Sequence, residues 1–203
     1  MCLIRLEDIN LRFDDNIIFD HFNLKVNSGD KILITGKSGR GKSTLLSILL
    51  GFVKADSGGY YFNGAPVSYP DLKKVRLNYA YVNQDVTIQE GIVREVLNRI
   101  AGFDHNNFNG VIDQELLEYF EFDESLFELH TSKLSGGQRQ RLGLMIALSL
   151  KRDIFLLDEI TSALDQELKD KTASYLANLQ ATVIVVSHDS CFLKTGKFKE
   201  VRW

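Results

Sequence analysis

A glycine-rich segment in the first quarter of the sequence could hold the phosphates of a nucleotide. Residues 36–43 read Gly-Lys-Ser-Gly-Arg-Gly-Lys-Ser, directly after the apolar run 31–35 and before an apolar periodic stretch. In this strand-loop-helix context the glycines let backbone N–H groups surround an anion, and the helix start adds partial positive charge. Lys42 would supply a cation to the β- and γ-phosphates, and the Ser43 hydroxyl could ligate Mg²⁺. The segment predicts a nucleoside triphosphate site.

Two consecutive carboxylates follow a second apolar run. Asp158 and Glu159 come directly after residues 154–157, which are continuously apolar. Ligands of α/β folds bind beyond the carboxyl ends of parallel strands, so we expect Asp158 near the phosphates, completing a Mg²⁺ site directly or through water. Glu159 is then placed to activate an attacking water as a general base. The alternative, an acidic turn that leaves a strand, is the weaker interpretation beside a phosphate loop.

The elements that must position these residues are of three kinds. The first 30 residues alternate apolar and polar side chains between turn signals, which predicts short antiparallel strands. Residues 154–157 and 182–186 are continuous apolar runs, typical of central strands in a parallel sheet that is covered on both faces. Helical periodicity prevails from about 86 to 134. We expect an α/β fold, a phosphate-loop core of mostly parallel strands with flanking helices, an antiparallel β subdomain and an inserted helical subdomain.

The chain is predicted to form one domain, 1–203. The approximate subdomains are antiparallel β at 1–30 and 56–83, the nucleotide-binding core at 31–55 and 141–203, and the helical part at 86–140.

Composition narrows the class of protein. The chain has 203 residues, a formal net charge of -3 and 2 cysteines, which suits a reduced protein and argues against binding nucleic acid by neutralising its phosphates. All apolar runs are far shorter than the roughly 20 residues that span a bilayer, and the first residues lack the pattern of a signal peptide. We expect a cytoplasmic protein close to a minimal catalytic unit, whose membrane role depends on a partner.

A third segment completes a recognisable order of motifs. Residues 134–138 read Leu-Ser-Gly-Gly-Gln and lie between the phosphate loop and the acidic strand end. With it, nearly the whole chain resembles the nucleotide-binding domain of ATP-binding cassette (ABC) ATPases. The resemblance implies ATP and Mg²⁺ as cofactors. It also implies a head-to-tail dimer, in which the signature motif 135–137 of one domain reaches the γ-phosphate that Lys42 of the other domain holds.

The resemblance also implies roles for individual positions. The nucleotide-binding positions are Phe13, which would stack on adenine, Gly36, Ser38, Gly39, Gly41, Lys42, Ser43 and Thr44 of the Walker A loop, Ser135, Gly136, Gly137 and Gln138 of the signature motif, and Asp165 of the D-loop. The catalytic positions are Glu159 of the Walker B motif, His188 of the switch and Gln84 of the Q-loop, and the metal ligands are Ser43, Gln84 and Asp158.

Several of these residues have simpler interpretations when taken alone. Ser135 could be a helix N-cap that forms a capping box with Gln138, a role that does not exclude phosphate contact. Gln84 could be a solvated amide at a strand end, His188 an ordinary polar residue, and Phe13 a core aromatic. Only the order of the motifs raises Gln84 and His188 above these interpretations. For Phe13 both interpretations stay open, because the family prefers Tyr at this position.

The leading hypothesis is the ATP-binding subunit of an ABC transporter, dimerising with itself or with a second ABC domain and peripheral at the inner face of the membrane through a separate transmembrane permease. An exporter is favoured by the lack of Pro after Glu159, although 128–133 lacks the Gly-rich acidic stretch of fused exporters.

The alternative is a soluble ABC ATPase of the DNA-maintenance or translation type. A chromosome-maintenance protein would need a long coiled coil between Gln84 and Ser135, and the translation type carries two cassettes in one chain. A nucleotide sensor without turnover is disfavoured by Glu159.

One acidic segment suggests a partner surface. No Lys or Arg lies between Ile100 and Ser132. The acidic residues in the same stretch include Asp113, Glu115, Glu118, Glu121, Asp123, Glu124 and Glu128. A solvated helix face is the simpler interpretation. The sharper one is an acidic rim that receives a basic cytoplasmic helix of the membrane partner.

Overall fold

Two separate sheets organise the chain, and the computed structural model describes residues 1–37, 41–103, 105 and 107–203. The antiparallel sheet has the strand order β2-β1-β4-β5. Its strands are β1 (Cys2–Phe13), β2 (Asn16–Asn27), β4 (Ser57–Phe62) and β5 (Ala65–Pro66). Much of β1 buries alternate side chains, as a strand with one face on the core must, and the predicted antiparallel pairing of the first 30 residues is confirmed.

The second sheet is parallel throughout and has the order β6-β7-β8-β3-β9. Its strands are β3 (Lys31–Thr35), β6 (Tyr79–Val82), β7 (Ile154–Asp158), β8 (Thr182–Val186) and β9 (Lys199–Arg202). Every residue of β7 and β8 is buried, because both faces of the sheet are covered. The prediction of central parallel strands from their continuous apolar runs is confirmed.

The prediction for residues 56–83 is wrong in its second half. We expected the whole stretch in the antiparallel sheet, but β6 pairs in parallel with β7, Tyr79 beside Ile154 and Val82 beside Leu157. Residues 69–78 form the short helices η1 (Tyr69–Asp71), α2 (Leu72–Val75) and η2 (Arg76–Asn78) instead of strand. An apolar strand of four residues fits either sheet by its own pattern, and only distant pairing decides between them.

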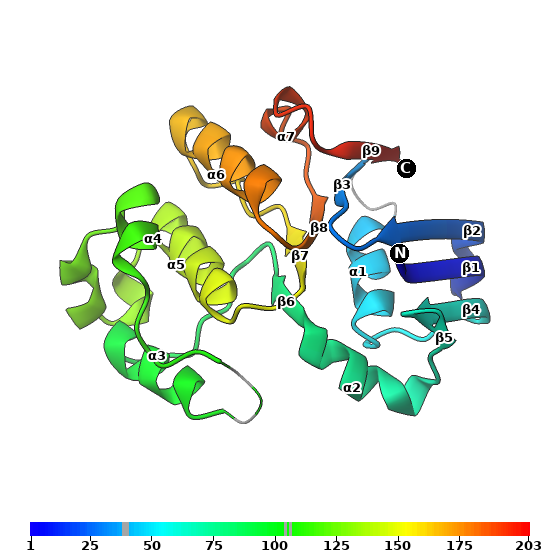
Figure 1. Cartoon of the computed structure of the whole chain (residues 1–203), viewed down its shortest axis with the longest axis horizontal. Coiled ribbons are helices and arrows are strands. Elements are labelled where there is room, and N and C mark those ends of the chain that lie inside the picture. Colours follow the sequence, from blue (N-terminus) through cyan, green and yellow to red (C-terminus); the bar gives the residue numbers. More distant parts are fainter. Residues whose placement is uncertain (38–40, 104, 106) are drawn as a thin grey trace.

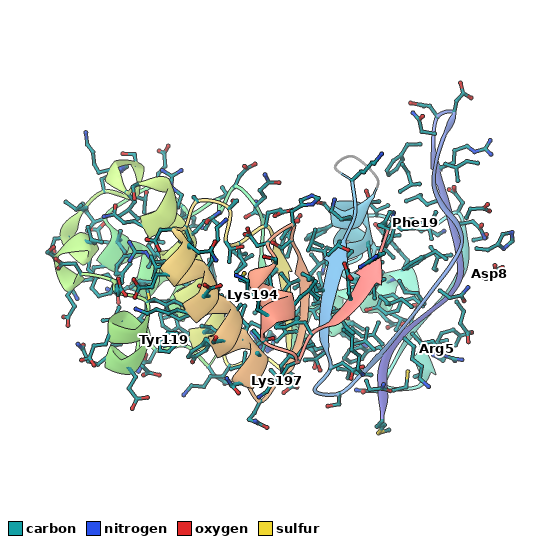
Figure 2. The ribbon with its side chains drawn as sticks, turned by 90° about the horizontal axis from the view of Figure 1, so that it is seen from above. Arg5, Asp8, Phe19, Tyr119, Lys194 and Lys197 are labelled. Atoms are coloured by element: carbon teal, nitrogen blue, oxygen red, sulfur yellow. The ribbon has the colours of Figure 1, made fainter. Side chains whose placement is uncertain are left out.

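The longer helices lie in two groups, and Figure 1 shows the helical part and the antiparallel sheet at opposite ends with the parallel sheet between them. The core helices are α1 (Lys42–Leu49), α5 (Gly136–Ser149), α6 (Gln166–Asn178) and α7 (Cys191–Lys194). The inserted part contains α3 (Val93–Ala101), α4 (Gln114–Tyr119), η3 (Glu124–Glu128) and η4 (Thr131–Lys133). The same separation appears from above in Figure 2, with Tyr119 at one end and Asp8 at the other.

Alternation along the central strands divides the apolar interior in two. Ile184 and Val186 of β8 join a cluster with α1 and the antiparallel sheet, whereas Val183 and Val185 join a cluster with α5, α6 and the inserted helices. Successive side chains of a strand point to opposite faces, so one sheet serves both clusters. Burial of each such side chain contributes roughly 1.5–3 kcal/mol. The strand ends that carry polar residues are thereby held between two packed layers.

Among the described residues, no helix combines the length and the apolar character that a bilayer crossing requires.

Candidate functional site

A cavity of about 330 Å³ lies where β3, β7 and β8 end. The residues that line it are Phe13, Ile18, Gly41, Lys42, Ser43, Thr44, Gln84, Asp158, Glu159, Val186 and His188. Segments far apart in the sequence therefore meet at the carboxyl ends of neighbouring parallel strands, the position where α/β folds bind ligands. All three predicted catalytic residues and all three predicted metal ligands are part of this lining.

The phosphate-loop lysine is buried and hydrogen-bonds to the first residues of its own loop. Lys42 is only 6% exposed, and its Nζ donates to the carbonyl oxygens of Gly36 at 2.7 Å and Lys37 at 3.0 Å. Gly41 precedes α1 with φ of 93°, a left-handed conformation that glycine adopts without strain. A Cβ at Gly41 would also lie 2.5 Å from the Ile18 side chain. The predicted residues Ser38 and Gly39 lie outside the described part of the chain.

Asp158 lines the cavity and is 4% exposed. Its Oδ1 is buried and has no hydrogen-bond partner among the residues that the structure describes. Burial raises the pKa of Asp158, while the Ser43 hydroxyl and the Lys42 cation oppose that rise. A buried carboxylate oxygen without a partner is costly, and a bound cation or its water would satisfy it.

The donors present fit Mg²⁺ in particular. Ser43, Gln84 and Asp158 offer hydroxyl, amide and carboxylate oxygens, the hard ligands that Mg²⁺ takes together with water and substrate phosphates. Within the described residues, no group of three or more His, Cys, Asp and Glu side chains could hold a metal ion.

Glu159 and His188 are neighbours in the lining of the cavity. His188 Nε2 lies 3.6 Å from Glu159 Oε1 and 3.4 Å from the Nζ of Lys42. Burial raises the pKa of Glu159, and the nearby His188 opposes the rise. Glu159 has φ of 48°, an uncommon conformation for a residue with a side chain. Such backbone strain concentrates at functional sites, where the surrounding structure holds it in place.

The signature residues lie outside this cavity and begin α5. Ser135 is its N-cap: the Ser135 Oγ accepts from the Gln138 backbone N at 3.2 Å, and the Gln138 Oε1 accepts from the Ser135 N at 2.8 Å. The predicted capping box is confirmed. Asp165 likewise caps α6, accepting from the Leu168 N at 2.9 Å. Thus Ser135, Gly136, Gly137, Gln138 and Asp165 are not brought to the cavity of their own chain.

Sequence reasoning missed several residues around the site. Ile18 of β2 contacts the phosphate loop, and no local sequence pattern predicts this contact. Trp203 packs against Gly36, where a Cβ on the glycine would lie 2.6 Å from the Trp203 Cβ. Gln140 is 5% exposed, and its position one turn before the buried Leu144 on α5 was the available signal of an inward-facing polar side chain.

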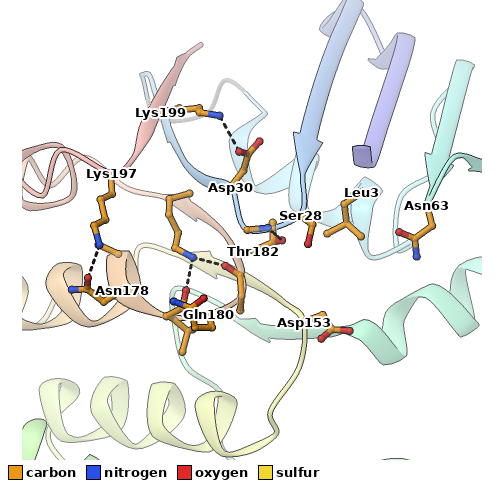
Figure 3. Close-up of a pocket in the computed structure, with 15 residues that line it drawn as sticks. Leu3, Ser28, Asp30, Asn63, Asp153, Asn178, Gln180, Thr182, Lys197 and Lys199 are labelled. Carbon is orange, nitrogen blue, oxygen red and sulfur yellow. Dashed lines mark hydrogen bonds and ion pairs between the residues drawn. The ribbon is translucent and has the colours of Figure 1, made fainter. Parts of the chain in front are cut away.

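A larger cavity of about 820 Å³ opens at the other ends of the strands (Figure 3). Its three lysines are all bound within the chain. Lys31 donates to the carbonyl oxygens of Leu179, at 2.8 Å, and Ala181; Lys197 donates to Asn178, and Lys199 pairs with Asp30 at 2.9 Å. Because these cations already satisfy carbonyl and side-chain oxygens, the cavity does not resemble a site prepared for an anion.

The acidic segment of the inserted helices is partly neutralised inside the chain. Glu128 pairs with Arg94 at 2.6 Å, and Glu121 pairs with Lys171. The Asp123 carboxylate accepts from the Ser125 backbone N at 2.8 Å, which lowers the pKa of Asp123. Fewer carboxylates of this segment are therefore available to a basic partner than the sequence suggested.

Comparison with known proteins agrees with the resemblance to ABC ATPases that the motifs indicated. A family model described as ABC transporter matches residues 19–162. The Fe(3+) ions import ATP-binding protein FbpC of Fusobacterium nucleatum is 30% identical over 196 residues, covering 92% of this chain and 51% of that protein. The probable iron export ATP-binding protein FetA of Escherichia coli is 31% identical over 191 residues, covering 92% and 85%. The chain spans about half the length of FbpC and of the sulfate/thiosulfate import protein CysA of Nephroselmis olivacea.

Solved structures agree in fold. The dimeric structure of a bacterial ABC transporter cassette superposes with a TM-score of 0.80 at 25% identity, covering 98% of this chain and 94% of that one. A dimeric cassette in a post-hydrolysis state bound to ADP and Pi gives a TM-score of 0.78, also at 25% identity, with the same coverage. Together with the family model, which matches well over half of the sequence, these likenesses place the chain in the ABC transporter family, with the fold of an ATP-binding cassette.

Proposed function

We propose that this chain binds ATP with Mg²⁺ and hydrolyses it as the ATP-binding subunit of an ABC transporter. The observation that carries the proposal is the meeting of Lys42, Asp158 and Glu159 in one cavity at the ends of parallel strands. A buried cation, an unsatisfied carboxylate oxygen and a second carboxylate are the parts that phosphoryl transfer to water needs. Membership of the family and the names of its relatives support the same conclusion.

The roles of the binding residues follow from their positions. Lys42 exchanges its bonds to the Gly36 and Lys37 carbonyls for the β- and γ-phosphates, while the N-terminus of α1 faces the same anion. Ser43, Gln84 and Asp158 would hold Mg²⁺, which would supply positive charge to offset the negative charge that develops during transfer. Phe13, 45% exposed at the rim of the cavity, offers its ring to the adenine base.

Glu159 is proposed to orient and deprotonate the attacking water. A general base must be ionised, and the cations of Lys42 and, when protonated, His188 favour the carboxylate over the acid. His188 also contacts the region into which the γ-phosphate would extend, because it lies 3.4 Å from the Lys42 Nζ.

Completion of the site is proposed to need a second cassette. Gly136 and Gly137 begin a helix of 14 residues outside the cavity, so their backbone N–H groups are available to an anion held by another domain. We therefore place the signature motif, Gln138 and Asp165 against the ATP of a head-to-tail partner, a second copy or a related ABC domain. Dimeric cassettes among the similar structures support this arrangement.

A separate transmembrane permease is the proposed membrane partner, which would place the chain at the cytoplasmic face of the membrane. The relatives bear names of both import and export ATP-binding proteins. Affinity isolation from membranes tests this point. Co-purification of a polytopic protein supports the proposal, whereas recovery of the chain without one favours the soluble alternative.

The variant Glu159→Gln tests the proposed hydrolysis. It should keep ATP binding and lower turnover by roughly 100- to 10,000-fold, because the amide cannot take a proton. In saturating Mg-ATP it should elute at twice the monomer mass as a trapped dimer. Glu90→Gln, on an exposed side chain, is the matched control and should behave like the wild type. A wild type that releases no phosphate, or a Glu159→Gln variant that stays monomeric with ATP bound, would contradict the proposal.

A further inference from the structure

Gln140 of α5 joins the signature helix to the segment that follows Glu159. Its Nε2 donates to the Ser162 Oγ at 2.7 Å and to the Glu159 carbonyl oxygen at 3.4 Å, and its Oε1 accepts from the Ala163 backbone N at 2.9 Å. The side chain is 5% exposed. A buried amide whose donor and acceptor ends are both used on one short segment has a fixed orientation.

The segment bound by Gln140 carries the strained residue of the site. Glu159 takes φ of 48°, and its backbone N donates to the Val186 carbonyl oxygen at 2.8 Å. Gln140 reaches the other side of the same residue, its carbonyl oxygen. The two contacts hold the peptide groups on both sides of the Glu159 Cα, and the direction of the Glu159 side chain into the cavity depends on that backbone conformation.

The start of α5 packs on the same turn. A Cβ at Gly137 would lie 2.9 Å from the Ala163 carbonyl oxygen, and one at Gly136 would lie 3.5 Å from the Ala163 Cβ. The signature glycines and Gln140 therefore contact residues 162–163 from one helix. A shift of the first turn of α5 must move this turn, or break the Gln140 bonds, because atoms at this separation leave no free space.

We infer that Gln140 is a positioning residue that fixes the carboxylate of Glu159 and couples it to the first turn of α5. The inference rests on the proposed function, since it gives Glu159 its role in hydrolysis. The hydrogen bonds of Gln140 go to residues 159–163 and it does not line the cavity, so it serves turnover and leaves binding of the nucleotide to Lys42 and its neighbours. Occupation of the signature glycines by a ligand would be transmitted through this amide to Glu159.

Three variants separate positioning from general stability. Gln140→Met keeps the length of the side chain but neither donates nor accepts, Gln140→Glu keeps an acceptor for the Ala163 N–H, and Ser162→Ala removes one partner only. Gln114→Met, on an exposed residue of α4, is the matched control. Each is measured as the purified full chain for kcat and KM in Mg-ATP, for melting temperature, and for ATP affinity from the fluorescence of Trp203, which packs against Gly36.

Gln140→Met should lower kcat roughly tenfold to a hundredfold, as small misplacements of a reacting group do, while KM and ATP affinity stay within about twofold. Gln140→Glu and Ser162→Ala should lose less, and the double variant Gln140→Met/Ser162→Ala should lose no more than Gln140→Met alone. Gln114→Met should leave all values unchanged.

The outcomes distinguish the two proposals. A wild type without hydrolysis refutes the proposed function. A wild type that hydrolyses ATP, beside a Gln140→Met variant of equal kcat, overturns the positioning role and leaves the proposed function intact. A parallel loss of kcat, ATP affinity and melting temperature would assign Gln140 a purely structural role and also overturn the inference.

Discussion

His188 Nε2 lies 3.6 Å from Glu159 Oε1. The two residues follow adjacent parallel strands, β8 and β7. Glu159 comes one residue after the end of β7, and His188 comes two residues after the end of β8. The imidazole is half exposed, whereas the Glu159 side chain is 17% exposed. The carboxylate is thus sheltered while its neighbour remains open to solvent, a suitable arrangement for a base that must meet one water molecule and exclude others.

Lys42→Ala should abolish tight nucleotide binding. The change removes a buried cation aimed at the phosphates and leaves the Gly36 and Lys37 carbonyl oxygens without their donor. Loss of a charged hydrogen-bonding group costs about 1.5–3 kcal/mol, which weakens ATP affinity roughly 10- to 150-fold. Fluorescence of Trp203 or calorimetry measures it. Lys37→Ala, in the same loop but exposed, is the control. An unchanged ATP affinity of Lys42→Ala would remove Lys42 from the site.

Phe13→Ala should weaken binding of ATP but not of inorganic triphosphate. Stacking of a base on an aromatic ring is worth about 1–3 kcal/mol, and only the base can use the ring. Phe13→Tyr should bind ATP like the wild type. Ile17→Ala, 58% exposed on β2 of the same hairpin, controls for loss of exposed apolar surface. Equal loss of ATP and triphosphate affinity would show that Phe13 shapes the loop and does not stack.

Local patterns predicted much of the fold, and long-range pairing accounts for the error. The continuous apolar runs identified β7 and β8, and the spacing of Ser135 and Gln138 identified a capping box, because both signals lie within a few residues. The sheet that β6 joins could not be predicted locally. Tyr79 and Ile154 pair across the whole inserted helical part, and alternation within four residues is the same for either partner.

The candidate site likewise contains residues that local spacing predicts and residues that it does not. Lys42, Asp158 and Glu159 were predicted because the phosphate loop and the acidic strand end have recognisable spacing, and parallel strands must bring their carboxyl ends together. Gln140 and Ile18 were missed because their contacts are with residues distant in sequence, and a single buried amide or apolar residue has no spacing of its own. The partial neutralisation of the acidic segment by Arg94 and Lys171 was likewise invisible.

Substitutions at Ser135 should separate its cap from its proposed phosphate contact. Ser135→Ala loses the bond from the Gln138 N and should lower the free energy of unfolding by about 1 kcal/mol. Ser135→Asp keeps an acceptor at the N-cap, and with it the stability, but its negative charge repels a γ-phosphate. In a Glu159→Gln background, Ser135→Asp should therefore abolish the ATP-dependent dimer peak in size-exclusion chromatography, and Ser135→Thr should retain it. A dimer that tolerates Asp would leave Ser135 with capping alone.

Asp189→Asn should destabilise the chain at neutral pH and cease to matter in acid. The Asp189 carboxylate accepts from the Thr161 Oγ1 at 2.5 Å and from the Lys169 Nζ at 2.8 Å. Burial acts to raise the pKa of Asp189, but these two bonds outweigh it and hold that pKa below its usual value. Because the folded pKa is depressed, the contribution is complete above the unfolded pKa of about 3.9 and disappears as pH falls through the folded value.

The expected loss for Asp189→Asn is about 1–2 kcal/mol at neutral pH, taken at the low end for a charged bond because the pair is partly open to solvent. Urea unfolding of both proteins measures it, and their midpoints should converge below about pH 4 as the wild-type carboxylate is protonated. Asp15→Asn, in the exposed hairpin turn, should give no such convergence. If the urea midpoints of wild type and Asp189→Asn stayed equally separated down to about pH 2, the charge of Asp189 would not be the cause of the difference. Neutral hydrogen bonds would then hold Asp189 to the turn that follows Glu159.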